Sequence, residues 1–139
     1  MIPIPVGTTA VLDVVVSAAH VVDFDEMGKV HPVYATYTMA KHFEEAGRKL
    51  LVPHLEAGEA GIGASVSVEH LAPSWVGDAL RVTARCVAVR DNRLTCECRA
   101  TDSYGRDLGY GTTVQAVLPA ALIEARVGED ARRRRSPAF

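Results

Sequence analysis

The chain has 139 residues, of which 48% are hydrophobic and 23% charged, and its formal net charge is −2. This length fits one domain with a substantial core, and the composition is typical of a soluble globular protein. The small net charge excludes a global field that would attract nucleic acid or an anionic membrane.

Two further patterns narrow the class of protein. No apolar run approaches the roughly 20 residues of a membrane span, and the start "MIPIPVGTT" lacks the basic and apolar regions of a secretion signal. The three cysteines have no Cys-x-x-Cys spacing, which argues against a disulfide framework or a zinc site. We therefore expect a cytoplasmic protein with no metal, cofactor, nucleic-acid partner or membrane attachment.

The predicted elements follow a simple order along the chain. Residues 8–22 are β-branched and apolar and predict a strand. A polar linker over 23–32 ends at a proline, and the pattern then predicts a helix over 33–51, which stops before Pro53. Alternation and turn residues predict four more strands, over 61–72, 80–90, 93–101 and 108–118.

One strand, one long helix and four antiparallel strands predict an α+β domain. Five strands bury the apolar face of a single helix by curling around it, so we expect a curved antiparallel sheet wrapped around a central helix over residues 1–122. Residues 123–139 carry four consecutive arginines and no apolar period, so a disordered basic tail is expected. A nucleic-acid-binding arm is the alternative for this tail.

The predicted helix has polar residues beside its apolar side. Glu44 lies on the edge of the apolar arc, and Thr36 points into the same arc if it is helical or caps the helix if it precedes it. Taken singly, Glu44 is explained as a residue that reaches water, and Thr36 as a cap or a small core residue.

A histidine on the next strand adds a third polar group to the same region. Alternation in "GIGASVSVEHLAP" places Ile62, Ala64, Val66, Val68 and His70 on one face, the face expected to cover the helix. A lone histidine on such a face is usually a satisfied core residue. A hydroxyl, a carboxylate and an imidazole that converge on one sheet–helix seam also suit acid–base or nucleophilic chemistry.

The stretches "VYATYTMAKHFEEA", "GEAGIGASVSVEH", "GDALRVTARCVAVRDNRLTCECRATD" and "GYGTTVQAVL" resemble the hot-dog-fold thioesterases, most of all the fluoroacetyl-CoA thioesterase branch. The resemblance implies a hot-dog fold and a homodimer with two acyl sites at the subunit interface. It implies hydrolysis of a small acyl-CoA or acyl-carrier thioester. Its catalytic threonine, glutamate and histidine correspond to Thr36, Glu44 and His70, and a glycine that lines the substrate site corresponds to Gly63.

Within this resemblance, Glu44 is expected to activate water or attack the thioester directly, while Thr36 and His70 orient groups and stabilise the developing charge. Two departures indicate a different acyl group. Gln115 stands where the family often has an arginine, and Phe24 is the only aromatic residue in the segment that corresponds to an aromatic lid.

Two other functions remain open from the sequence. One is a non-catalytic acyl-thioester-binding protein on the same fold. The other is a hydratase or dehydratase, for which Asp25 and His31 are the nearby Asp/His candidates. The remaining histidines, His20, His42 and His54, are interpreted as surface or structural residues.

Overall fold

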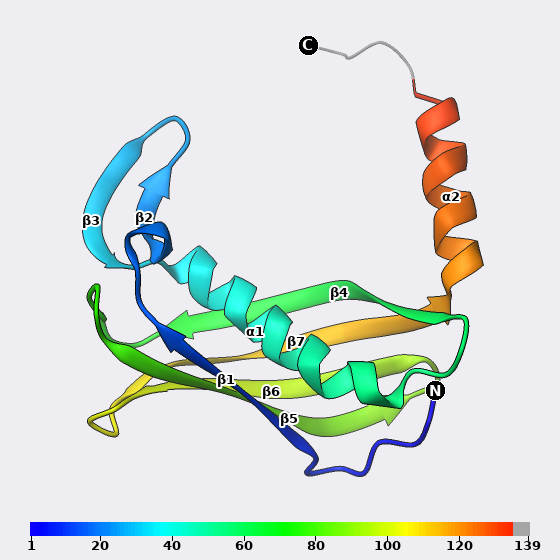
Figure 1. Cartoon of the computed structure of the whole chain (residues 1–139), viewed down its shortest axis with the longest axis horizontal. Helices are drawn as coiled ribbons and strands as arrows, with labels where there is room; N and C mark the ends of the chain where they lie inside the picture. Colours follow the sequence, from blue (N-terminus) through cyan, green and yellow to red (C-terminus); the bar gives the residue numbers. More distant parts are fainter. Residues whose placement is uncertain (135–139) are drawn as a thin grey trace.

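The computed structural model describes residues 1–134. Within these residues the chain forms two α-helices, seven strands and two single 3-10 turns (Figure 1). The strands and helices are β1 (Thr9–Val15), β2 (Val21–Phe24), β3 (Gly28–Tyr34), α1 (Thr36–Leu51), β4 (Glu59–His70), β5 (Ala79–Arg90), β6 (Arg93–Asp102), β7 (Asp107–Pro119) and α2 (Ala120–Arg132).

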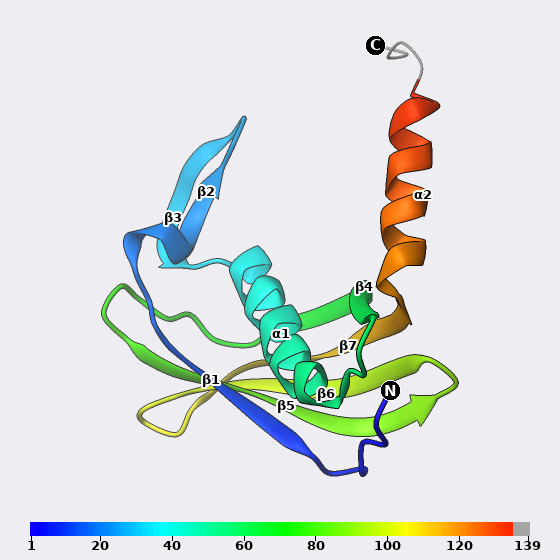
Figure 2. The ribbon, with the colours of Figure 1, turned by 45° about the vertical axis from the view of Figure 1, so that its right-hand side comes forward.

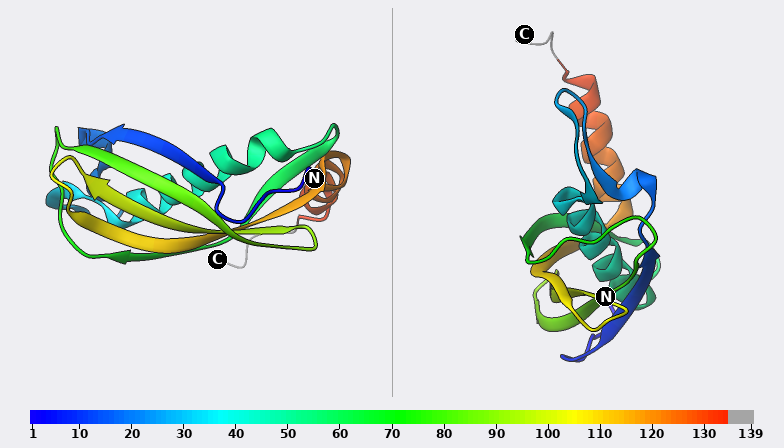
Figure 3. Two further views of the ribbon diagram at one scale, coloured as in Figure 1. Left: turned by 90° about the horizontal axis from the view of Figure 1, so that it is seen from below. Right: turned by 90° about the vertical axis from the view of Figure 1, so that its left-hand side faces the viewer.

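Five of the strands form one antiparallel sheet in the order β1-β5-β6-β7-β4. The sheet is curved, and α1 runs along its concave face and contacts every strand (Figure 3). This arrangement confirms the predicted α+β architecture of a curved antiparallel sheet around one central helix. It leaves β1 and β4 as the two edges of the sheet.

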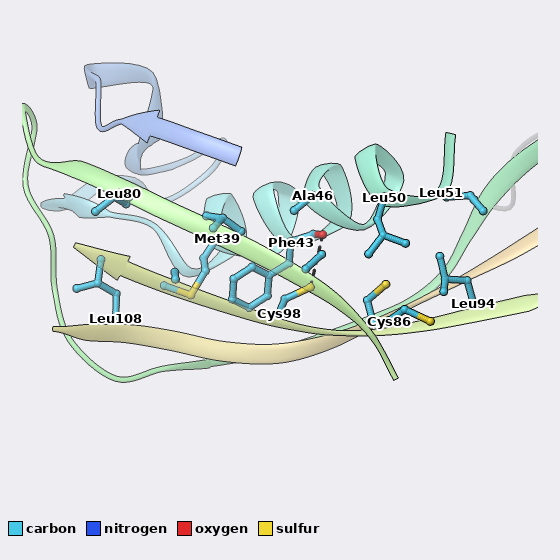
Figure 4. Close-up of a cluster of buried hydrophobic side chains, with 14 of the residues drawn as sticks. Met39, Phe43, Ala46, Leu50, Leu51, Leu80, Cys86, Leu94, Cys98 and Leu108 are labelled. Carbon is cyan, nitrogen blue, oxygen red and sulfur yellow. Dashed lines mark hydrogen bonds between the residues drawn. The ribbon is translucent and has the colours of Figure 1, made fainter. Parts of the chain in front are cut away.

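The core lies between α1 and the sheet (Figure 4). Met39, Phe43, Ala46 and Leu50 recur every three or four residues along α1, so they share one face, and all four are buried. Each large apolar side chain buried in this way contributes about 1.5–3 kcal/mol of transfer free energy. The Cys98 thiol also donates a long hydrogen bond of 3.8 Å to the Phe43 carbonyl oxygen.

Small residues let α1 approach β7 closely. A Cβ added to Gly47 of α1 would lie 2.8 Å from Thr113 Oγ1 on β7. On β7 itself, a Cβ on Gly109 would meet the Met39 sulfur, and one on Gly111 would meet the Ser67 carbonyl oxygen of β4. The helix therefore rests almost directly on the backbone at the β4–β7 end of the sheet.

The segment predicted as a polar linker over 23–32 is instead a hairpin, β2–β3, which stands away from the main sheet (Figure 2). Its turn ends at Gly28, whose φ of 71° suits a residue without a Cβ. The sequence conceals the hairpin because its charged residues face solvent, and Pro32 is tolerated in a two-stranded ribbon. As a result α1 begins at Thr36 rather than at Val33.

A β-bulge in β4 changes the predicted alternation. The register with β7 shifts between Gly63 and Ser65, so the side chains that face the helix change parity there. Val68 packs against the core and His70 reaches Thr36 on the helix side as predicted, whereas Ile62 points away and is 44% exposed. The prediction of one continuous buried row from Ile62 to His70 is therefore wrong for its first half.

The sequence predicts disorder from residue 123, but Ala120–Arg132 forms α2. Alanine, leucine, glutamate and arginine dominate this segment and favour helix even without a core to pack on. The last part of the predicted tail, residues 135–139, lies outside the described residues. In the part of the chain that is described, no helix is long and apolar enough to cross a membrane.

Candidate active site

Thr36 and His70 form a direct polar pair at the start of α1. Thr36 Oγ1 lies 2.9 Å from His70 Nδ1. The N-cap of α1 is Ala35, whose backbone is extended, so the Thr36 side chain is not used as a cap and is free to reach the strand. The Nε2 atom of His70 is buried and makes no hydrogen bond within residues 1–134. A buried imidazole nitrogen of this kind is available to a reacting group.

A second polar pair lies behind the first. The Tyr34 hydroxyl is 2.5 Å from His42 Nδ1, and both side chains are buried. Burial raises the pKa of Tyr34 and lowers the pKa of His42, so both groups are neutral near pH 7 and the hydroxyl donates to the imidazole. The Tyr34 ring also meets the His70 ring edge-on, with centroids 6.3 Å apart.

Of the two interpretations that the sequence allowed for His42, a surface or a structural residue, the structure supports the second. His42 is only 5% exposed because the half-buried His20 covers that side of α1, with ring centroids 5.1 Å apart. Helical spacing could not have predicted this pair, because Tyr34 ends strand β3 while His42 lies on α1.

Glu44 lies in a different place, on a cleft of about 490 Å³ between α1 and the β4–β7 strands. Glu44 itself is exposed in the single chain rather than enclosed by an apolar wall. Gly63 faces it closely, because a Cβ on Gly63 would lie 3.3 Å from Glu44 Oε1. Lys41 and Arg48 flank the carboxylate on the same cleft, and Arg48 also donates a hydrogen bond to the Gly61 carbonyl oxygen.

The floor of this cleft contains unpaired polar atoms. Gln115 and Thr113 line the cleft and are almost fully buried. The Gln115 Nε2 and Thr113 Oγ1 atoms make no hydrogen bond within the described part of the chain. Buried polar atoms are usually paired, so the Gln115 amide marks a place where a polar ligand group fits, whereas the Thr113 hydroxyl faces the Cys96 and Cys98 thiols.

The structure thus brings the predicted residues together in two groups rather than one. Thr36 and His70 form the first group, and Glu44, Gly63 and Gln115 form the second. Thr36 and Glu44 are eight residues apart on one straight helix, which corresponds to about 12 Å along its axis. The predicted convergence of Thr36, Glu44 and His70 therefore does not occur within one chain. Residues that share one face of a helix can still be far apart along its length.

The alternative acid–base pair is not assembled. Asp25 lies in the hairpin turn and His31 on β3, and both are exposed. Neither makes a side-chain hydrogen bond or an ion pair with another described residue. Among residues 1–134 there is also no group of three or more His, Cys, Asp or Glu side chains placed to hold a metal ion.

Comparison with known proteins identifies the family. The sequence model of the fluoroacetyl-CoA-specific thioesterase family matches residues 16–121, which is most of the chain. The chain belongs to this family. It is 31% identical over 102 residues to the fluoroacetyl-CoA thioesterase of Streptantibioticus cattleyicolor, a match that covers 73% of each protein.

Solved structures agree with this membership of the fluoroacetyl-CoA-specific thioesterase family. A Thermus thermophilus hypothetical protein, described as a thioesterase superfamily member, has 45% identity and a TM-score of 0.94, covering 96% of this chain and 97% of that one. A fluoroacetyl-CoA thioesterase variant in complex with acetyl-CoA has 28% identity and a TM-score of 0.84, covering 91% and 98%. The fold is accordingly the hot-dog fold, and the chain is a thioesterase.

Proposed function

We propose that this thioesterase hydrolyses a short-chain acyl-CoA thioester at a site shared by two subunits. The observation that carries the proposal is the division of the polar residues into two groups, one at the start of α1 and the other near its middle, about two turns further on. Acid–base and nucleophilic chemistry needs its groups within hydrogen-bond reach of one substrate. A second copy would supply each group with the one that it lacks.

The edge strand β4 offers the means to bring the two groups together. Its outer side is unpaired within the described chain, and exposed strand edges tend to pair with another strand. If β4 pairs antiparallel with its own copy about a two-fold axis between Val66 and Ser67, Gly63 and the partner's His70 are equally far from the axis and lie opposite each other. Glu44, which lies over Gly63, then comes beside the partner's Thr36 and His70.

In this shared site the residues divide the work of thioester hydrolysis. The Glu44 carboxylate either removes a proton from water as the water attacks the carbonyl carbon, or attacks that carbon itself before water releases the acyl group. In both routes the carbon–sulfur bond breaks and coenzyme A leaves as its thiol. The partner's Thr36–His70 pair and the first backbone N–H groups of its α1, which have no helical acceptor, stabilise the negative charge on the carbonyl oxygen.

The cleft itself supports a small acyl group attached to an anionic carrier. The close approach of Gly63 to Glu44 leaves little room for a long chain beside the carboxylate. Lys41 and Arg48 line the cleft beside Glu44 and Glu45, and their two positive charges suit the phosphates of coenzyme A. Gln115 adds a neutral donor on the floor of the cleft, which suits a carbonyl oxygen rather than a carboxylate.

The first experiment measures thiol release from acetyl-, propionyl-, butyryl-, octanoyl- and fluoroacetyl-CoA with a thiol reagent. The protein's own cysteines give little background, because burial raises the pKa of Cys96 to about 12 and that of Cys98 to about 11. Short acyl-CoAs should be hydrolysed, and Glu44→Gln should lower kcat at least about 100-fold. Binding of acyl-CoA without thiol release would instead favour the non-catalytic binder.

The shared site is tested by mixing two inactive variants. Glu44→Gln and His70→Ala chains, unfolded together and refolded, form dimers of which about half are mixed. Each mixed dimer contains one site with an intact Glu44 and an intact His70 from different chains, so about a quarter of the wild-type activity should return. No recovery, although the mixed dimers form, would contradict the shared site.

A further inference from the structure

The second helix, α2, has nothing to pack on within its own chain. It continues from the end of β7 and stands clear of the sheet (Figures 1 and 2), and none of its residues 120–132 is buried in the described structure. A separate helix of 13 residues is only marginally stable in water. Yet Ala120, Ile123, Val127 and Ala131 form an apolar stripe at helical spacing.

The opposite end of the molecule carries a matching apolar surface, the end patch, formed by Val30, Leu71, Trp75 and Val76. All four side chains are exposed, and Trp75 is 48% exposed. The three residues on the loop after β4 lie beside the hairpin because Trp75 bridges to Val33 at the base of β3. Several large apolar side chains exposed at one end of a molecule indicate a site of interaction.

The direction in which these parts project identifies what covers them. The β2–β3 hairpin and α2 both extend past the β4 edge, from opposite ends of that strand, and they point the same way (Figures 1 and 3). A two-fold axis through the middle of β4 exchanges the two ends of the molecule. It therefore brings α2 of one subunit to the end of its partner that carries the hairpin and the end patch.

We propose that the apolar stripe of α2 packs on the end patch of the partner subunit and closes the outer side of the shared active site. The proposal rests on the two-fold pairing of β4 in the proposed function. The end patch begins directly after His70, and α2 follows the strand that carries Gln115. One side of each site would thus be formed by α2 of the subunit that provides Glu44. This helix would pack on the subunit that provides His70.

Charges on the same two ends are complementary. Asp23, Asp25 and Glu26 make the hairpin tip acidic, and they form no ion pair with any residue from 1 to 134. At the other end of the molecule, the β5–β6 turn exposes Arg90 and Arg93 against the single Asp91, and the two arginines have no ion-pair partner in the described chain. The same two-fold axis brings the acidic hairpin tip of one subunit toward these arginines of its partner.

The single tryptophan of the chain provides a direct test. A nitroxide label attached at Val127→Cys should strongly quench Trp75 fluorescence, because the two sites meet across the dimer. Quenching within a chain is excluded, since Trp75 and α2 lie at opposite ends of the 12-residue strand β4, about 40 Å apart. The three native cysteines are buried and should not take the label.

Two controls accompany this measurement. The same labelled protein with its nitroxide chemically reduced should show the full Trp75 fluorescence. A label at Ala125→Cys, on the opposite side of α2 from Val127, should quench clearly less. The quenching should also disappear on dilution, at the concentration where sedimentation shows that the dimer dissociates.

The outcomes separate this proposal from the proposed function. A stable dimer without quenching from position 127 overturns the packing of α2 on its partner, whatever the hydrolysis assay shows. A protein that is monomeric at all concentrations removes both the packing and the shared site. Quenching in a protein that hydrolyses none of the thioesters supports the packing while it contradicts the proposed reaction.

A pair of charge variants gives an independent readout. Val127→Asp places a charge in the apolar stripe and should raise the dimer dissociation constant at least about tenfold. Ala125→Asp adds the same charge to the opposite side of the helix and should leave the dissociation constant within about twofold. Equal effects of the two changes would contradict the proposed face of α2.

Discussion

The buried pair of Tyr34 and His42 allows a prediction whose size follows from the structure. Tyr34→Phe keeps the ring and its packing but removes the hydroxyl that donates to His42 Nδ1 over 2.5 Å. Because Tyr34 is 1% and His42 5% exposed, water cannot replace the lost donor without disturbing the core. We expect the free energy of unfolding to fall by about 1–3 kcal/mol, the cost of a buried acceptor left unpaired.

Urea unfolding at pH 7.5 measures this loss, at one fixed protein concentration because the stability of a dimer depends on concentration. Tyr104→Phe is the matched control, since Tyr104 is exposed on the β6–β7 turn and should change the free energy by less than about 0.5 kcal/mol. The double variant Tyr34→Phe/His42→Leu removes both polar groups and should recover part of the loss, because no acceptor is then left unpaired. Equal midpoints for Tyr34→Phe and Tyr104→Phe, or strict additivity in the double variant, would refute the reasoning.

Three further predictions concern pH, the cleft and helix packing. Burial lowers the pKa of His42 below its ordinary 6.5, so below about pH 6.5 the unfolded state binds more protons. The free energy of unfolding should then fall on acidification by at most about 1.4 kcal/mol per pH unit; His42→Leu should flatten this slope between pH 7.5 and 5, and an unchanged slope would exclude His42 as its source. Gly63→Ala puts a Cβ 3.3 Å from Glu44 Oε1 and should displace the carboxylate. We expect kcat to fall about tenfold or more at unchanged thermal stability. An unaltered kcat would show that the reaction tolerates this displacement of the carboxylate. Gly47→Ala gains about 1 kcal/mol of helix propensity but overpacks Thr113 at a cost of about 1–3 kcal/mol. Urea unfolding should therefore show a lower free energy of unfolding, which a second change, Thr113→Ala, should restore. A Gly47→Ala protein that is more stable than the wild type would show that the helix can shift freely.

Most of the fold could be predicted from the sequence because its signals are local. The recurrence of Met39, Phe43, Ala46 and Leu50 defines the buried face of α1 without reference to any other element. Strand alternation, together with the Asp, Asn and Gly of the turns, defines the sheet strands and their antiparallel order. The sequence also anticipates the contact between Thr36 and His70, since both lie on faces that must meet when the sheet covers the helix.

The parts that the sequence does not determine depend on contacts between elements. The bulge between Gly63 and Ser65 reverses the facing of Ile62, because a single extra residue changes parity without altering composition. His42 is buried because Tyr34 stacks on its ring and the turn that carries His20 folds back over α1.

The same limit applies to function. The sequence determines that the chain carries a threonine, a glutamate and a histidine on elements that pack together, which suffices for the chemistry of a thioesterase. Only the tertiary structure shows that His70 bonds to Thr36 and not to Glu44, and that the outer side of β4 and the apolar stripe of α2 lack partners within the described chain. The periodicity of the sequence shows which face of an element is buried. Whether groups on different elements come within hydrogen-bond reach in one chain depends on how the helix and the sheet pack together.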